Sequence, residues 1–347
     1  MSKRFDIGKL VRENIRQLVP YASARDEFSG TASVFLDANE NPFNAPLNRY
    51  PDPKQQHLKE EIARLKGLDP ACLFLGNGSD EGIDLLIRVL CEPGRDHLIT
   101  VDPTYGMYGV CAAVNGVERR SVQLREDFSL DPEAVIGEAD SRTRIIFLCS
   151  PNNPTSNSLD RRAMLRIIDA ADCVVVVDEA YVDFSGEPGL LSMVREKRNL
   201  VVLQTFSKAW GMAGVRLGML FADPELIGYL TAVKYPYNVN ALTLDQVQRS
   251  LREPAAMKGW VDRILRQRDL LAGALASLPF VRRVYPSDAN FLLVRMEDPR
   301  GVYRYLTAQG IIVRDRSSVP LCEGCLRITV GTENENRLLM NALKKFA

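Results

Sequence analysis

The chain has 347 residues, of which 46% are hydrophobic and 25% are charged, close to the average for globular proteins. Its 44 basic and 44 acidic residues cancel, so the net charge gives no reason to expect nucleic acid or an anionic membrane as a partner. No apolar run approaches the roughly 20 residues that span a bilayer. The charged N-terminus lacks the apolar core of a signal peptide, so a cytoplasmic location is expected.

The middle of the chain alternates short apolar segments with amphipathic segments. Apolar runs predict strands at residues 71–75, 97–101, 144–149, 173–177 and 199–205. Apolar residues at helical spacing predict helices between them, the clearest over 79–90 and 159–171. Because these strands are continuously apolar and are separated by helices, they indicate a parallel sheet that is covered on both faces.

The C-terminal third has a different pattern. Two helices are predicted over 243–251 and 255–278, with Pro254 marking the break between them. Short strands are then predicted at 281–285, 291–295, 311–314 and 326–330, before a final helix. We therefore expect an α/β fold with a large domain, residues 45–240, whose mostly parallel sheet is covered by helices on both faces. A smaller α+β domain is expected from both termini, residues 1–44 and 241–347.

The seven cysteines and two histidines give little support for a metal site. Cys322 and Cys325 form a C-x-x-C pair, but the sequence holds no second such pair and too few histidines for a structural zinc site. Other cysteines lie in apolar segments, which is typical of reduced thiols in a protein core. We expect no bound metal.

Polar side chains follow three of the predicted strands. Asn153 follows the strand that ends near residue 149. Asp178 and Tyr181 follow the strand that ends near residue 177, and Lys208 follows the strand that ends near residue 205. In an open α/β sheet, ligands bind outside the carboxyl ends of the strands. If these strands are parallel neighbours, the amide, the carboxylate, the phenol and the amine meet at one edge of the sheet.

A lysine that meets these groups suits one cofactor, pyridoxal phosphate (PLP). Lys208 would form a Schiff base with PLP, and the Asp178 carboxylate would keep the pyridine nitrogen protonated, so that the ring accepts the electrons left when a Cα–H bond breaks. Asn153 and Tyr181 can hydrogen-bond the ring oxygen. Once released from the cofactor, the Lys208 amine can move a proton at Cα.

The phosphate of PLP also requires a binding site, and the segment over residues 76–82, GNGSDEG, provides one. Its glycine-rich turn comes directly before a predicted helix, where free backbone N–H groups and the helix dipole favour an anion. We expect the N–H groups of Asp80 and Glu81 to bind the phosphate while both carboxylates turn away. Ser207 and Arg216 lie near enough to Lys208 in sequence to complete the site.

Each of these residues alone has an ordinary structural explanation. Asp178 could cap a turn, and Tyr181 and Tyr105 could simply pack in a core; the ordered combination is what favours PLP. Two other hypotheses stay open. One is a dinucleotide-binding protein, because the glycines at 76, 78 and 82 differ by one position from the G-x-G-x-x-G fingerprint. The other is a regulator that binds PLP without catalysis.

The order of motifs resembles a known family. GNGSDE, DPTYGMY, SPNNPTSN, VDEAY, TFSKAWGMAGVRLG and CLRITVG together resemble the fold type I PLP-dependent aminotransferases. Within that group, LVPYA, LDANENP, LNRYPDP and GCLRITVGT are similar to the histidinol-phosphate aminotransferases, and the resemblance covers nearly the whole chain. One departure is Ser156, which stands where the family usually has glycine in PNNPTG.

The resemblance implies a role for each matching residue. Lys208, Asp178 and Tyr181 would be catalytic, and Tyr105 would stack on the cofactor ring. Tyr50 would reach the cofactor phosphate of the neighbouring subunit, which implies a homodimer. The residues implied for substrate binding are Tyr21, Asn39, Arg314 and Arg327.

The resemblance also implies a reaction. The chain would transfer an amino group between L-histidinol phosphate and 2-oxoglutarate, giving imidazole-acetol phosphate and L-glutamate, a step of histidine biosynthesis. A broad-range or aromatic aminotransferase and a threonine-phosphate decarboxylase of the same fold stay open as alternatives. Amino transfer and decarboxylation differ in which bond at Cα lies perpendicular to the ring, and the sequence does not show that orientation.

Overall fold

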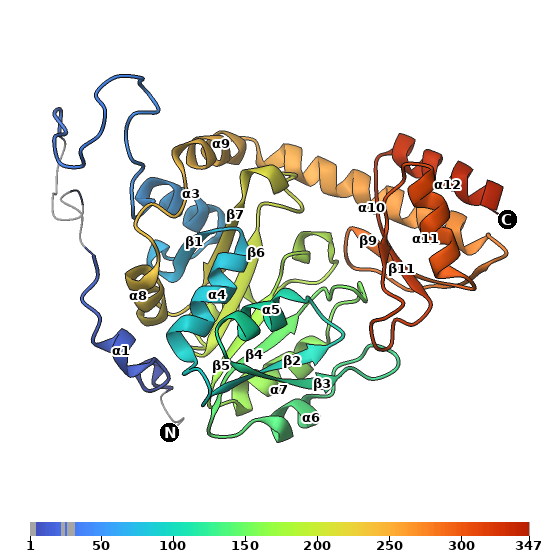
Figure 1. Cartoon of the computed structure of the whole chain (residues 1–347), viewed down its shortest axis with the longest axis horizontal. Helices are drawn as coiled ribbons and strands as arrows, with labels where there is room; N and C mark the ends of the chain where they lie inside the picture. Colours follow the sequence, from blue (N-terminus) through green and yellow to red (C-terminus); the bar gives the residue numbers. More distant parts are fainter. Residues whose placement is uncertain (1–4, 22–24, 26–31, 347) are drawn as a thin grey trace.

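The computed structural model describes residues 5–21, Arg25 and residues 32–346. Seven strands form one sheet in the order β1-β7-β6-β5-β4-β2-β3 (Figure 1). They are β1 (Leu73–Asn77), β2 (His97–Asp102), β3 (Glu118–Gln123), β4 (Thr143–Cys149), β5 (Val174–Asp178), β6 (Leu200–Thr205) and β7 (Leu217–Phe221). Neighbours are parallel except where β7 pairs with β1 and with β6. The predicted, mostly parallel sheet is confirmed, and β3 and β7 are additions to it.

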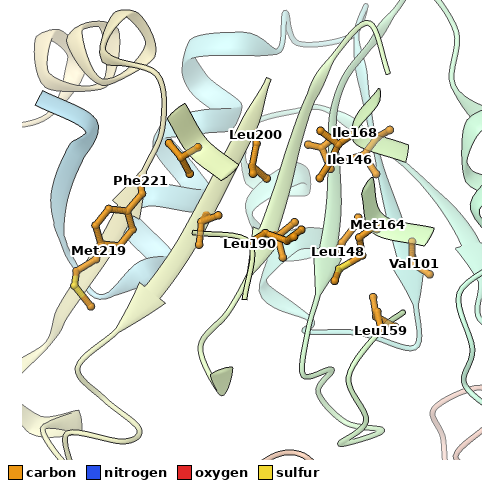
Figure 2. Close-up of a cluster of buried hydrophobic side chains, with 14 of the residues drawn as sticks. Val101, Ile146, Leu148, Leu159, Met164, Ile168, Leu190, Leu200, Met219 and Phe221 are labelled. Atoms are coloured by element: carbon orange, nitrogen blue, oxygen red, sulfur yellow. The ribbon is translucent and has the colours of Figure 1, made fainter. Parts of the chain in front are cut away.

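Helices cover both faces of this sheet (Figure 1). On one face lie α4 (Ser79–Leu90), α5 (Met107–Val114) and α8 (Pro224–Val233), and on the other α3 (Gln56–Lys66), α6 (Pro132–Glu138) and α7 (Arg161–Ala170). Strand β5 shows why its sequence is continuously apolar. Val174 and Val176 pack against the helices of the face that carries α4, α5 and α8. Val175 and Val177 pack on the opposite face, in the hydrophobic cluster that Figure 2 shows in part.

The C-terminal part forms a second, antiparallel sheet in the order β10-β11-β9-β8. Its strands are β8 (Val281–Val284), β9 (Phe291–Met296), β10 (Arg314–Asp315) and β11 (Cys325–Thr329). After α9 (Ala241–Leu251), the long helix α10 (Pro254–Ala276) leads into this sheet, and α11 (Pro299–Ala308) and α12 (Glu333–Phe346) pack with α10 on one face of it (Figure 1). Within the part of the chain that the structure covers, no helix is both long and apolar enough to cross a membrane.

The N-terminal segment packs against the large sheet. The described elements are η1 (Ile7–Lys9) and α1 (Glu13–Arg16). Ile7 and Val11 are buried among side chains of α4 and α8, and the Arg12 N–H donates to Val89 O at 3.0 Å. The assignment of residues 1–44 to the smaller domain stays a prediction, although the apolar side chains of this part pack beside α4 and α8. The domain boundaries near residues 45 and 240 stay a prediction.

Strand β7 requires glycine at residue 218. A Cβ atom there would lie 2.2 Å from the Ser79 nitrogen and 2.3 Å from the Gly78 carbonyl carbon, both backbone atoms at the start of α4. We expect Gly218→Ala to lower the free energy of unfolding by about 1–3 kcal/mol, because backbone must move to admit the methyl group. Urea unfolding measures this. Gly214→Ala is the control, since a Cβ there meets no atom within 4 Å; equal losses in the two variants would contradict the prediction.

Candidate active site

A pocket lies at the carboxyl ends of β4, β5 and β6, beside the start of α4. The structure places many of the predicted site residues around it: Asp80, Tyr105, Asn153, Asp178, Tyr181, Ser207, Lys208 and Arg216. The parallel register explains the convergence, because Cys149 at the end of β4 lies opposite Asp178, and Asp178 lies opposite Leu203 of β6. The three loops that follow these strands therefore leave the sheet side by side.

Lys208 and Asp178 are the oppositely charged groups of this pocket. Asp178 is only 3% exposed, and burial raises the pKa of its carboxyl, although hydrogen bonds from Tyr108 Oη at 2.7 Å and Ala180 N at 3.1 Å oppose that rise. Burial lowers the pKa of the Lys208 amine, and the positive charge of Arg327 adds to this effect. A lysine with a lowered pKa presents more of the unprotonated amine, which is its nucleophilic form.

Tyr108 is a site residue that the sequence analysis missed. It is fully buried, its ring stacks on Phe147 with centroids 4.5 Å apart, and its hydroxyl holds Asp178. The signal that could have found it is the second tyrosine of TYGMY, three residues after Tyr105, because this spacing places two side chains on the same side of a helical turn. The two tyrosine rings do meet edge to face, with centroids 5.6 Å apart.

We expect Tyr108→Phe to keep the fold, because the ring retains its packing, and to lower the free energy of unfolding by about 1–3 kcal/mol through the lost hydrogen bond. That hydrogen bond lowers the pKa of Asp178. Its loss should therefore raise this pKa further and move the acidic limb of the pH–rate profile to higher pH. Urea unfolding and the pH dependence of kcat test both effects. Tyr305→Phe, in the second sheet's helical layer, is the control and should leave the profile unchanged.

The start of α4 and the turn before β7 form one end of the pocket. Gly78, Ser79 and Asp80 line it, so the N-terminal end of the helix borders the pocket. Gly78 N donates to Arg216 O at 3.0 Å, and the Arg216 backbone is left-handed, with φ of 59°. Ser207 lies close by, its Oγ 3.0 Å from Thr205 Oγ1. The N–H groups at the start of α4, the hydroxyls of Ser207 and Thr205 and the guanidinium of Arg216 form a suitable site for a phosphate.

The two acidic residues at the start of α4 behave differently. The Glu81 carboxylate accepts hydrogen bonds from Asn77 N and, at 3.0 Å, from Asn238 Nδ2, outside the pocket lining. The Asp80 carboxylate instead accepts a hydrogen bond from Tyr105 Oη at 3.0 Å. The expectation that both carboxylates turn away from the pocket was therefore wrong for Asp80, because the nearby phenol binds it on the pocket side.

Arg327 connects the second sheet to the pocket. It lies on β11, and its Nη1 donates to Asn153 Oδ1 at 2.6 Å. Its guanidinium lies 5.3 Å from the centroid of the Phe291 ring, and burial lowers its pKa. Arg314, opposite Arg327 in the register of β10 and β11, is exposed.

Three further predicted residues, Tyr21, Asn39 and Tyr50, line other hollows of the single chain. Tyr21 is 75% exposed and lines a different hollow, beside α8. Asn39 and Tyr50 line another hollow near the start of α9, where Tyr50 stacks on Tyr237 with ring centroids 4.4 Å apart. Their predicted roles in substrate binding, and that of Tyr50 at a neighbouring subunit, stay predictions.

Ser156 adopts the backbone conformation that favours glycine, with φ of 69°. Its hydroxyl donates to Thr155 O and, at 3.1 Å, lies against Pro286 O in the turn between β8 and β9. The departure from the glycine of the motif therefore keeps the turn and adds a contact to the second sheet.

Comparison with known proteins identifies the family. The family described as aminotransferase class I and II matches residues 31–343, and the chain belongs to it. The chain is 56% identical over 339 residues to a histidinol-phosphate aminotransferase of Parabacteroides distasonis, covering 98% of each chain. It is 53% identical to one of Bacteroides fragilis, covering 98% of this chain and 99% of the other. The family assignment decides against the dinucleotide-binding alternative.

Solved structures agree in fold. The histidinol-phosphate aminotransferase from Clostridium acetobutylicum superimposes with a TM-score of 0.80 at 24% identity, covering 86% of this chain and 91% of the other. The same enzyme from Sinorhizobium meliloti, solved in complex with pyridoxal 5'-phosphate, gives a TM-score of 0.79 at 23% identity, covering 89% and 90%. At these identities the likeness establishes the fold of the chain.

Proposed function

We propose that the chain transfers an amino group between L-histidinol phosphate and 2-oxoglutarate, with PLP as cofactor, giving imidazole-acetol phosphate and L-glutamate. The observation that carries the proposal is that Lys208 and Asp178 share one pocket with the Arg327–Asn153 pair at its border. The names of relatives that are 46–56% identical to this chain over nearly its whole length support the choice of substrate.

The residues of the pocket fit PLP. Asp178 offers a buried carboxylate for the pyridine nitrogen, and Tyr105 offers an aromatic ring at the pocket wall. The start of α4, with Ser207 and Arg216, offers N–H, hydroxyl and guanidinium donors for the phosphate. When bound, PLP supplies a conjugated ring that accepts the electron pair released when a bond at the substrate Cα breaks.

The side chains of this chain then have distinct tasks. The Lys208 amine is the point of covalent attachment and, once free, moves a proton at the substrate Cα. The Asp178 carboxylate holds a proton at the pyridine nitrogen, and the Tyr108 hydroxyl fixes the position of that carboxylate. Tyr181, which is 8% exposed and whose ring centroid lies 5.5 Å from Lys208 Nζ, excludes water from the amine and binds the ring oxygen with Asn153.

Arg327 is suited to an enzyme that must accept both a phosphate monoester and a dicarboxylate. A guanidinium binds either anion through two parallel N–H···O hydrogen bonds. Its hydrogen bond to Asn153 orients the group at the pocket border before substrate arrives. Binding of the substrate anion therefore draws on the second sheet, whereas the cofactor is bound mainly by the large sheet and its helices.

We also propose that the enzyme is a cytoplasmic homodimer. The exposed position of Tyr50, near the start of α9 and away from its own chain's pocket, supports a contact with a second copy. Gel filtration of the purified chain tests this, and a monomeric elution volume at assay concentration would contradict it.

The function is tested by product analysis. Purified protein with PLP should form L-glutamate from L-histidinol phosphate and 2-oxoglutarate, and a panel of aromatic amino acids measures side activity. The main alternative is a decarboxylase, since an L-threonine-O-3-phosphate decarboxylase from Porphyromonas gingivalis superimposes with a TM-score of 0.75 at 27% identity. Release of carbon dioxide from L-threonine O-3-phosphate, with no L-glutamate formed from L-histidinol phosphate and 2-oxoglutarate, would overturn amino transfer.

A further inference from the structure

Arg314, Arg316 and Arg327 lie on the face of the second sheet that meets the pocket. Arg314 is opposite Arg327 in the register of β10 and β11, and the Arg316 N–H donates to Cys325 O at 2.9 Å, which continues the same pairing. Residues two apart on a strand point to the same face, so the side chains of Arg314, Arg316 and Arg327 share a face. The contact of Arg327 with Asn153 shows that this face is turned to the pocket.

No described carboxylate forms an ion pair with Arg316, although its positive charge helps to lower the pKa of the adjacent Asp315. Its Nε is buried and has no hydrogen-bond partner among them, and its strongest charged neighbours are Arg327 and Arg314. Asp315 lies on the opposite face, where its carboxylate accepts a hydrogen bond from Ser317 N at 2.8 Å. Arg316 is half-buried, and holding a cation there without a hydrogen-bond partner for Nε is costly, which favours a bound anion at this position.

A neighbouring arginine shows what a structural role looks like on this face. Arg295 of β9 donates from Nη2 to Leu321 O at 3.3 Å, and its guanidinium lies 5.9 Å from the centroid of the Tyr285 ring. The Nε of Arg295 also lacks a partner, but Arg316 has no side-chain hydrogen bond to the described chain comparable to the one that Arg295 Nη2 makes. The difference indicates that Arg295 supports the loop before β11, whereas the partner of Arg316 comes from outside the chain.

We propose that Arg316 is a specificity-determining residue, which binds the phosphate of the phosphate-monoester substrate together with Arg327. This inference rests on the proposed function. A phosphate monoester carries close to two negative charges at neutral pH, and two guanidinium groups match it. The α-carboxylate of L-glutamate carries one charge, which Arg327 alone matches. Arg316 therefore selects for the phosphate substrate and contributes little to the binding of glutamate.

The test separates the two half-reactions in the PLP-loaded full chain. In Arg316→Gln, the concentration of L-histidinol phosphate needed for half-maximal conversion should rise about 10- to 100-fold, the effect of one charged hydrogen-bonding group. The value for L-glutamate should stay close to that of the unchanged protein. Arg304→Gln is the matched control, because Arg304 is an exposed arginine of α11 and its replacement removes the same charge from the same domain.

Inorganic phosphate gives a second readout that does not depend on the identity of the phosphate substrate. It should inhibit the L-glutamate half-reaction of the unchanged protein and of Arg304→Gln, and much less that of Arg316→Gln. Arg316→Lys keeps the charge without the guanidinium fork and should be intermediate; it also serves if the glutamine variant does not fold. Equal losses for both substrates, or no loss for phosphate, would overturn the proposal. If L-histidinol phosphate is not a substrate at all, the proposed function fails, while phosphate inhibition still decides the role of Arg316.

Discussion

Lys208→Ala should abolish amino transfer and lower kcat by more than about 10⁴-fold, the upper end of what one acid–base group contributes. The reason is that one side chain has two tasks: it attaches the cofactor and it moves the proton at Cα. The purified unchanged protein should show a visible absorption band that borohydride abolishes, and the variant should lack this band. Steady-state kinetics and the spectrum of the same preparation test both tasks together.

Two controls separate the amine from its charge. Lys208→Arg keeps a positive charge facing Asp178 but has no nucleophilic amine at neutral pH, so we expect it to be as inactive as the alanine variant. Lys9→Ala removes a lysine whose side chain is 81% exposed and should leave both the band and kcat unchanged. Substantial activity in Lys208→Arg would mean that charge alone suffices, which would contradict a covalent role.

The second large effect is expected from Asp178→Asn, which should lower kcat by about 10²–10³-fold through the loss of one preorganised electrostatic group. Asparagine has the same shape, and its Oδ1 can still accept from Ala180 N while its Nδ2 donates to Tyr108 Oη, so the fold should be retained. Removing a carboxylate that is 3% exposed also removes the cost of keeping a charge away from water. We therefore expect kcat to fall without loss of stability, which circular dichroism and urea unfolding measure.

Asp183→Asn is the matched control for this variant. Asp183 lies in the same loop, five residues after Asp178 and partly exposed, but it does not line the pocket. Its replacement should leave kcat unchanged. A small loss of kcat in Asp178→Asn together with a large loss of stability would indicate that the carboxylate supports the fold and leaves the chemistry to other groups.

Local patterns predicted the elements that build the pocket. The helix over residues 79–90 was predicted because apolar side chains recur at helical spacing, and the structure has α4 at these residues. Strand β3, ERRSVQ, was missed because it lies at the edge of the sheet and is largely exposed, so that it lacks an apolar run. Strand β7 has such a run, LGMLF, but it is short and contains the glycine that its close approach to α4 requires.

The candidate site was predicted where motifs carry the chemistry and missed where packing does. Lys208, Asp178 and Asn153 follow strands, and the parallel register brings them together. Tyr108 is different, because its role comes from meeting Asp178, 70 positions along the chain. The role that we propose for Arg316 was not predicted from the sequence for a similar reason. Only the pairing of β10 with β11 shows that its side chain shares a face with Arg327. The packing of the N-terminal segment was not predicted, because its few apolar residues do not reveal which of two cores they enter.

The position of β7 has a consequence for how the chain is made. Strand β1 joins the large sheet through β7, so the glycine-rich turn after β1 cannot reach its final place beside Lys208 until residues 217–221 have been synthesised. Contacts between segments this distant in sequence form slowly. A nascent chain that has not yet reached β7 therefore exposes an unpaired β1 on the ribosome, and the pocket beside Lys208 is completed only after most of the polypeptide has emerged.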